Sequence, residues 1–181
     1  MKPALLLVDL QNDYLAAVGL QPVADALISR AAALLDTCRQ RKIPVIHIWT
    51  TVDRDNDRRL PHWKKNNRWQ CVAGTAGHKT PESLQPLNGE IIVHKTGFNA
   101  FANSELDATL KKINCDTIIL AGLHLHACVR AAAIGGLERG LRRAGHGNED
   151  VTFVAIRGNL GEVGWQLIAG NISPGRTSNG G

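Results

Sequence analysis

Mainly apolar runs recur along this chain and predict the strands of a sheet. They cover residues 4–9, 43–51, 90–95 and 116–122. The first run, Ala4–Val8, contains no polar residue before it ends at an acid. A strand of this kind is typical of a parallel sheet, in which helices cover both faces.

Amphipathic segments separate these runs and predict helices. Residues 22–41 carry apolar side chains at three- and four-residue steps, as does a segment that begins at Asn103 or Ser104, and a further helix is expected over 127–141. Alternation of strand and helix implies right-handed crossovers. The predicted fold class is therefore α/β, a three-layer αβα arrangement around an open, mostly parallel sheet of the Rossmann-like type.

Three chemically versatile residues stand at the ends of predicted strands, namely Asp9, Lys95 and Cys128. Open α/β sheets bind ligands just outside the carboxyl ends of their strands. Cys128 lies where a strand hands over to a helix, and the unpaired N–H groups of a helix start favour a thiolate. We therefore expect Cys128 to be a catalytic nucleophile. For Asp9 an alternative is that its carboxylate only caps the following turn.

Residues 52–90 are polar, rich in Arg, Asn, Gly and Pro, and show little periodicity. A connection of this length is usually a functional loop or lid. His62 and Trp63 are then placed over a pocket, or else Trp63 and Trp69 simply fasten the loop to the body. No metal site is expected, because the histidines and acids of this segment lack metal-ligand spacing.

Size and composition are those of one globular domain. The 181 residues are 44% hydrophobic, carry a formal net charge of +5 and include four scattered cysteines. Scattered cysteines favour reduced thiols. No apolar run has the length of a membrane span and no signal-peptide cleavage site is evident, so we expect a cytoplasmic protein. The positive residues do not line one helix, which argues against nucleic-acid binding.

Three motifs together resemble the isochorismatase-like cysteine hydrolase superfamily, which includes nicotinamidases, N-carbamoylsarcosine amidases and biuret hydrolases. They are residues 6–13 (Leu-Leu-Val-Asp-Leu-Gln-Asn-Asp), 94–101 (His-Lys-Thr-Gly-Phe-Asn-Ala-Phe) and 122–139. Their order, approximate spacing and flanking apolar runs agree with that family. The resemblance extends from about Lys2 to Gly140.

The resemblance implies a role for each matching residue. Cys128 is the nucleophile, Asp9 takes the thiol proton and later assists the leaving amine and the water, and Lys95 orients and supports the pair. It also implies a cis peptide bond at Leu123–His124 and an oxyanion hole made by the N–H groups of His124 and Cys128. The residues expected to bind substrate are Gln11, His62, Trp63, Phe98 and Phe101.

Two features depart from the family pattern. The Asp-x-His metal site of nicotinamidases is missing after the second predicted strand, where residues 51–57 read Thr-Val-Asp-Arg-Asp-Asn-Asp. A nicotinamidase activity with its metal is therefore not favoured. His124 stands where the family has a small residue, and its side chain either reaches the substrate or points into the scaffold.

The end of the chain does not follow the family. After a predicted strand over 151–156, the sequence is rich in glycine and shows no long amphipathic helix. We expect a hydrolase domain over residues 1–156 and a poorly patterned tail over 157–181, with the native C-terminal element of the fold missing. One hypothesis is a frameshift near codon 141.

These observations lead to one main functional expectation and one alternative. The main expectation is hydrolysis of a C–N bond in a small amide or ureide through a Cys128 thioester, without a cofactor. The protein is expected to form a homo-oligomer and to bind a small-molecule substrate, and it is not expected to bind nucleic acid or a membrane. The alternative is a non-catalytic scaffold or ligand-binding protein of the same fold. A flavodoxin-like nucleotide binder is not favoured, because no glycine-rich phosphate loop follows the first strand.

Overall fold

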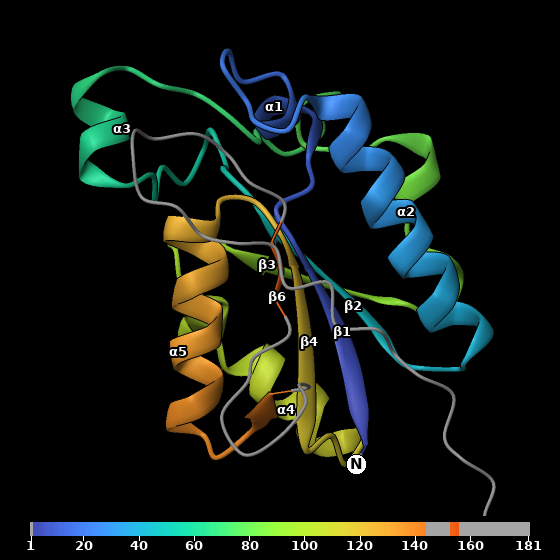
Figure 1. Cartoon of the computed structure of the whole chain (residues 1–181). Coiled ribbons are helices and arrows are strands. Elements are labelled where there is room, and N and C mark those ends of the chain that lie inside the picture. Colours follow the sequence, from blue (N-terminus) through green and yellow to red (C-terminus); the bar gives the residue numbers. More distant parts are fainter. Residues whose placement is uncertain (1, 144–152, 156–181) are drawn as a thin grey trace, which may run out of the picture.

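A parallel sheet runs through the centre of the molecule (Figure 1). The structure, a computed structural model, describes residues 2–143 and 153–155. Its strands are β1 (Pro3–Val8), β2 (Val45–Thr50), β3 (Ile91–Lys95), β4 (Thr117–Gly122), β5 (Arg142–Arg143) and β6 (Phe153–Ala155). The order is β3-β2-β1-β4, and β5 and β6 both pair with β4, at different heights. Every pairing is parallel, so the carboxyl ends of β1 to β4 meet at one edge.

Helices cover both faces of this sheet. The α-helices are α1 (Asn12–Leu15), α2 (Ala24–Gln40), α3 (Pro61–Lys65), α4 (Ser104–Lys112) and α5 (Arg130–Glu138). Short 3-10 helices η1 (Glu82–Leu84) and η2 (Ala100–Ala102) and a π-helical turn η3 (Leu125–Val129) complete the described elements. Figure 1 shows α2 on one side of the sheet and α4 and α5 on the other. Among the described residues, no helix is both long and apolar enough to cross a bilayer.

Side chains of β1 divide between two cores, one on each face of the sheet. Leu5 and Leu7 belong to the cluster that contains Leu35 of α2. Leu6 belongs to the opposite cluster, which contains Leu106 of α4. Alternation along a strand sends successive side chains to opposite faces, so a strand apolar at every position must be covered twice. The predicted three-layer αβα fold with a parallel sheet is confirmed.

The long segment 52–90 is fastened to the body of the domain. An isolated bridge joins Val52 to Val72. Trp63 is 6% exposed, belongs to the core cluster beneath α2, and has its ring centroid 6.5 Å from that of Tyr14. The structure therefore supports the interpretation in which Trp63 holds this segment on the domain.

Some element boundaries differ from those predicted. The helix expected to begin at Ala127 is preceded by the π-helical turn η3, which begins at Leu125, and the α-helix α5 itself begins at Arg130. The strand expected over 151–156 contains β6. Residues 157–181, the expected tail, lie outside the described residues, so the expected loss of a C-terminal element stays a prediction.

Gly122, the last residue of β4, lies where the carboxyl end of the sheet leaves no space for a side chain. Its φ is 147°, and a Cβ placed there would lie 1.9 Å from the carbonyl oxygen of Val8. Both the backbone conformation and the close approach exclude a side chain, so Gly122→Ala should lower the free energy of unfolding by about 3 kcal/mol or more. Urea denaturation measures this. The control is Gly97→Ala, where nothing lies within 4 Å of the added Cβ; equal stability of the two variants would contradict this account.

Candidate active site

Asp9, Lys95 and Cys128 meet at the carboxyl ends of β1, β3 and β4. Lys95 Nζ lies 2.7 Å from Asp9 Oδ2 and 3.5 Å from Cys128 Sγ. The three residues are nearly inaccessible, with exposed fractions of 0% for Asp9, 4% for Lys95 and 5% for Cys128. Residues that are far apart in sequence are thus brought into one buried contact, as their positions at strand ends predicted.

Asp9 is aimed into this site by the way in which β1 ends. Its φ is 55°, a left-handed conformation that aspartate tolerates better than most residues. Its Oδ1 accepts hydrogen bonds from the backbone N–H of Thr50 at 3.0 Å and from the Thr50 hydroxyl at 2.8 Å. The carboxylate therefore accepts hydrogen bonds from Thr50 of the neighbouring strand β2 and does not cap the turn that follows β1.

The second carboxylate oxygen of Asp9 has a different environment. Oδ2 is buried and faces Lys95 Nζ as an ion pair, but within the described part of the chain it accepts no aligned hydrogen bond. Buried carboxylate oxygens are normally satisfied by hydrogen bonds. An oxygen left in this state can exchange a proton with a group that enters the site.

Thr50 links the two charged residues of the site. Its hydroxyl donates to Asp9 Oδ1 and accepts from Lys95 Nζ, both at 2.8 Å. Gln11 holds Thr50 in turn: Oε1 accepts from Thr50 N at 2.8 Å, and Nε2 donates to the carbonyl oxygens of Thr50 at 2.9 Å and His78 at 2.7 Å. The Gln11 amide is therefore engaged with the scaffold, which differs from the substrate contact expected of it.

Burial controls the protonation of the site. Removal from water, followed by the charge of Asp9, raises the pKa of Cys128 to about 12, although Lys95 opposes the shift. For Lys95 burial disfavours the charge, but Asp9 and Cys128 outweigh it, so the pKa of Lys95 lies above its ordinary value. Burial thus favours the neutral thiol of Cys128 beside the ion pair of Asp9 and Lys95. This differs from the thiolate that the helix start led us to expect, because desolvation outweighs the helix-terminal N–H groups.

The turn before Cys128 contains His124. The Leu123–His124 peptide bond is cis, where the resemblance places one, and Cys128 lies in the first helical turn that follows. The half-buried His124 ring meets the edge of Tyr14 with centroids 5.5 Å apart. Burial, and then the neighbouring His126, lower the pKa of His124. The side chain of His124 therefore contacts the rings of Tyr14 and His126.

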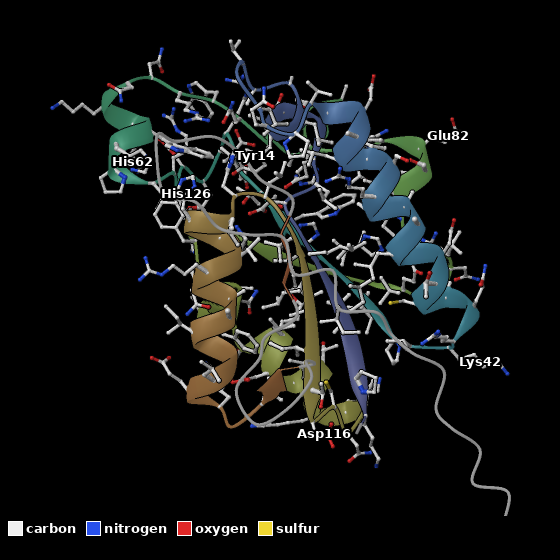
Figure 2. The ribbon with its side chains drawn as sticks, viewed as in Figure 1. Tyr14, Lys42, His62, Glu82, Asp116 and His126 are labelled. Atoms are coloured by element: carbon white, nitrogen blue, oxygen red, sulfur yellow. The ribbon has the colours of Figure 1, made fainter. Side chains whose placement is uncertain are left out.

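The aromatic residues expected to bind substrate fall into an exposed pair and a buried pair. His62 is exposed and stacks on Phe98 with centroids 6.3 Å apart. Phe101 is 2% exposed and packs under α5, with its ring under the Arg139 guanidinium. Figure 2 shows His62 near the α3 end of the molecule, the end where Tyr14 and His126 also lie. His62 and Phe98 are thus available at that end, whereas Phe101 and Trp63 are core residues.

Two residues of this site were not expected from the sequence. Thr50 ends β2 and lies beside Lys95 in the register of β2 and β3, so the strand-end rule that selected Asp9 and Lys95 would also have selected it. Tyr14 could not be selected in this way, because it lies in the short helix α1, whose sequence has no clear periodicity. Within residues 2–143 and 153–155, no group of three or more His, Cys, Asp or Glu side chains is placed to hold a metal ion.

Because the pKa of Cys128 is raised, we expect its reactivity toward alkylating reagents to depend strongly on pH. Because only the thiolate reacts, alkylation of Cys128 by iodoacetamide should become about tenfold faster for each pH unit between pH 7 and 10. Asp9→Asn removes a negative charge that raises this pKa, so alkylation at pH 8 should become several-fold to about tenfold faster. Peptide mass spectrometry follows the reaction, with the half-buried Cys115 in the same digest as the control. A slower or unchanged rate in Asp9→Asn would contradict the assigned electrostatics.

Comparisons with known proteins agree with this geometry. The isochorismatase domain model matches residues 3–144. The chain is 29% identical over 151 residues to maleamate amidohydrolase of Pseudomonas putida, an alignment that covers 78% of this chain and 68% of the relative. It is 27% identical over 152 residues to ureidoacrylate amidohydrolase RutB of Agrobacterium fabrum, covering 71% and 67%.

A solved structure gives the same result for the fold. The N-carbamoylsarcosine amidase of Thermoplasma acidophilum superposes with a TM-score of 0.68 at 26% identity, covering 79% of each chain. The family model spans most of the sequence, including all three residues of the buried contact. The chain therefore belongs to the isochorismatase family of hydrolases.

Proposed function

We propose that this protein hydrolyses a C–N bond of a small amide or ureide through a thioester at Cys128. The observation that carries the proposal is the buried contact of Lys95 Nζ with both Asp9 Oδ2 and Cys128 Sγ. A nucleophile, a proton acceptor and a fixed positive charge within hydrogen-bonding reach of one another are the parts that covalent acyl transfer needs.

In the first half-reaction Cys128 Sγ attacks the substrate carbonyl carbon while its proton passes to Asp9. The carbonyl oxygen gains negative charge, which the backbone N–H groups of His124 and Cys128 stabilise. The tetrahedral intermediate then collapses: the C–N bond breaks, and Asp9 returns the proton to the leaving nitrogen. An amine, or ammonia from a primary amide, departs and leaves the thioester.

In the second half-reaction a water molecule attacks the thioester carbonyl. Asp9 accepts a proton from that water, the C–S bond breaks, and the proton returns to Sγ as the acid is released. Lys95 keeps the carboxylate of Asp9 oriented throughout, and the Thr50 hydroxyl holds both groups in register. A thiol whose pKa is raised to about 12 needs such an adjacent acceptor, because little thiolate is present at neutral pH.

The relatives support the amide class of substrate. Two of them are named amidohydrolases and the superposed structure is an amidase. Hydrolysis of a C–N bond is the reaction that these names share. The contacts of Lys95 with both Asp9 and Cys128 support the catalytic proposal over the non-catalytic alternative.

Replacement of the nucleophile tests the proposal. Cys128→Ala should lower ammonia release from a panel of small amides and ureides by at least about a thousandfold, because the covalent route is removed. The control is Cys115→Ala, a half-buried thiol whose Sγ lies 3.1 Å from the Thr117 carbonyl oxygen; its activity should equal that of the wild type.

Full turnover by Cys128→Ala would refute the covalent mechanism. A wild-type protein that releases no ammonia from any member of the panel, and whose Cys128 shows no reactivity toward thiol reagents, would favour the non-catalytic alternative.

A further inference from the structure

Three polar side chains that the proposed reaction does not use meet where β2 and β3 end. Thr51 Oγ1 lies 2.9 Å from His78 Nε2 and 2.7 Å from His94 Nδ1. The two imidazole rings are nearly parallel, with an interplanar angle of 15° and centroids 5.9 Å apart. The ring of Trp49 lies nearly perpendicular to both, with its centroid 5.3 Å and 6.3 Å from theirs. Two ring nitrogens from different segments therefore converge on one oxygen atom.

Backbone contacts hold these side chains in place. The N–H of Thr51 donates to the carbonyl oxygen of Lys95 at 2.9 Å, and the carbonyl oxygen of His78 accepts from Gln11 Nε2 at 2.7 Å. His94 belongs to β3 and is fixed by the pairing of that strand with β2. The two imidazoles are thus held close together before any ligand arrives, which lowers the entropic cost of binding between them.

This histidine pair differs from the buried histidine of β2 in its partner and its access to solvent. His47 is 1% exposed and contacts a carboxylate oxygen of Glu90 at 2.9 Å. His94, by contrast, is exposed, and its contact is a neutral hydroxyl that contributes little net stability and can be displaced. Burial, followed by His94, lowers the pKa of His78, which favours the neutral imidazole that ligates metal ions. An ion from solution can therefore reach two nitrogen ligands.

We propose that His78 Nε2 and His94 Nδ1 bind a divalent transition-metal ion that prefers nitrogen ligands, such as Zn²⁺ or Ni²⁺. The ion replaces the Thr51 hydroxyl between the two nitrogens. Water completes its coordination, because no group of three or more His, Cys, Asp or Glu side chains is placed for a metal among the described residues. Since His78 belongs to segment 52–90 and His94 to β3, the ion fastens that segment to the strand that ends in Lys95.

The sequence could not show this pair. The expectation that no metal binds rested on spacing within residues 52–90, whereas His94 lies outside that segment and only the fold brings it to His78. The proposed site also lies outside the contact of Asp9, Lys95 and Cys128. Metal binding here therefore does not depend on the proposed hydrolysis, and it can be measured without a substrate.

Thermal unfolding of the full chain, without an affinity tag, tests the site. A ligand that binds the folded protein raises its Tm, so Ni²⁺ should raise the Tm of the wild type by several degrees, whereas Mg²⁺, which prefers oxygen ligands, should not. His94→Gln should abolish the shift with Ni²⁺. The matched controls are His62→Gln and His126→Gln, which replace exposed histidines that also lie against another ring; both should keep the shift.

Calorimetry with Ni²⁺ measures the binding directly. The full chain carrying Cys128→Ser, which removes one competing thiol, should bind one equivalent of Ni²⁺. The affinity should fall at least about tenfold in His78→Gln and in His94→Gln, since even a residue that only orients a metal ligand is worth about ten- to a hundredfold in affinity. It should not fall in His62→Gln or His126→Gln. Absence of saturable Ni²⁺ binding, or binding that is undiminished in His94→Gln, would overturn the site.

Discussion

The ion pair between Asp9 and Lys95 is the interaction on which the rest of the site depends. Both side chains are almost wholly removed from water, which costs each charge several kcal/mol that only a close partner can offset. Their 2.7 Å contact supplies that partner. Loss of one member would leave an unpaired buried charge, a change that costs about 3–5 kcal/mol in proteins. The pair can persist only because neighbouring elements hold it in place.

That support comes from the sheet itself. The parallel strands β1, β2 and β3 bring Asp9, Thr50 and Lys95 to one edge, where the Thr50 hydroxyl bridges the two charges. Gln11 fixes the backbone of Thr50. Because β4 ends at Gly122 against the carbonyl of Val8, the following turn can bring Cys128 close to the same ion pair. The fold thus places the thiol beside a carboxylate whose Oδ2 is ion-paired with Lys95 but, among the described residues, accepts no hydrogen bond, an arrangement suited to proton transfer on attack.

The sequence predicted the parts of this arrangement that follow from topology. Asp9, Lys95 and Cys128 could be placed together because parallel strands share an edge, and the αβα layers followed from strands that are apolar on both faces. Side-chain direction was less predictable. Gln11 and Phe101 lie within the sequence motifs, yet neither side chain is free to bind substrate. Gln11 hydrogen-bonds to the backbone of the scaffold, and Phe101 is a core residue that is 2% exposed. The state of the Cys128 thiol was also missed, because desolvation depends on three-dimensional packing that no local pattern encodes.

The central claim is that C–N hydrolysis passes through a covalent bond to Cys128. Intact-protein mass spectrometry after rapid acid quench of the enzyme mixed with an amide that it hydrolyses tests this most directly. The account predicts a transient mass increase equal to the acyl part of the substrate, located on the Cys128 peptide and formed no later than the first equivalent of ammonia. Steady ammonia release from a protein that carries no adduct at any quench time, even when thioester hydrolysis is slowed by a sluggish substrate, would contradict it.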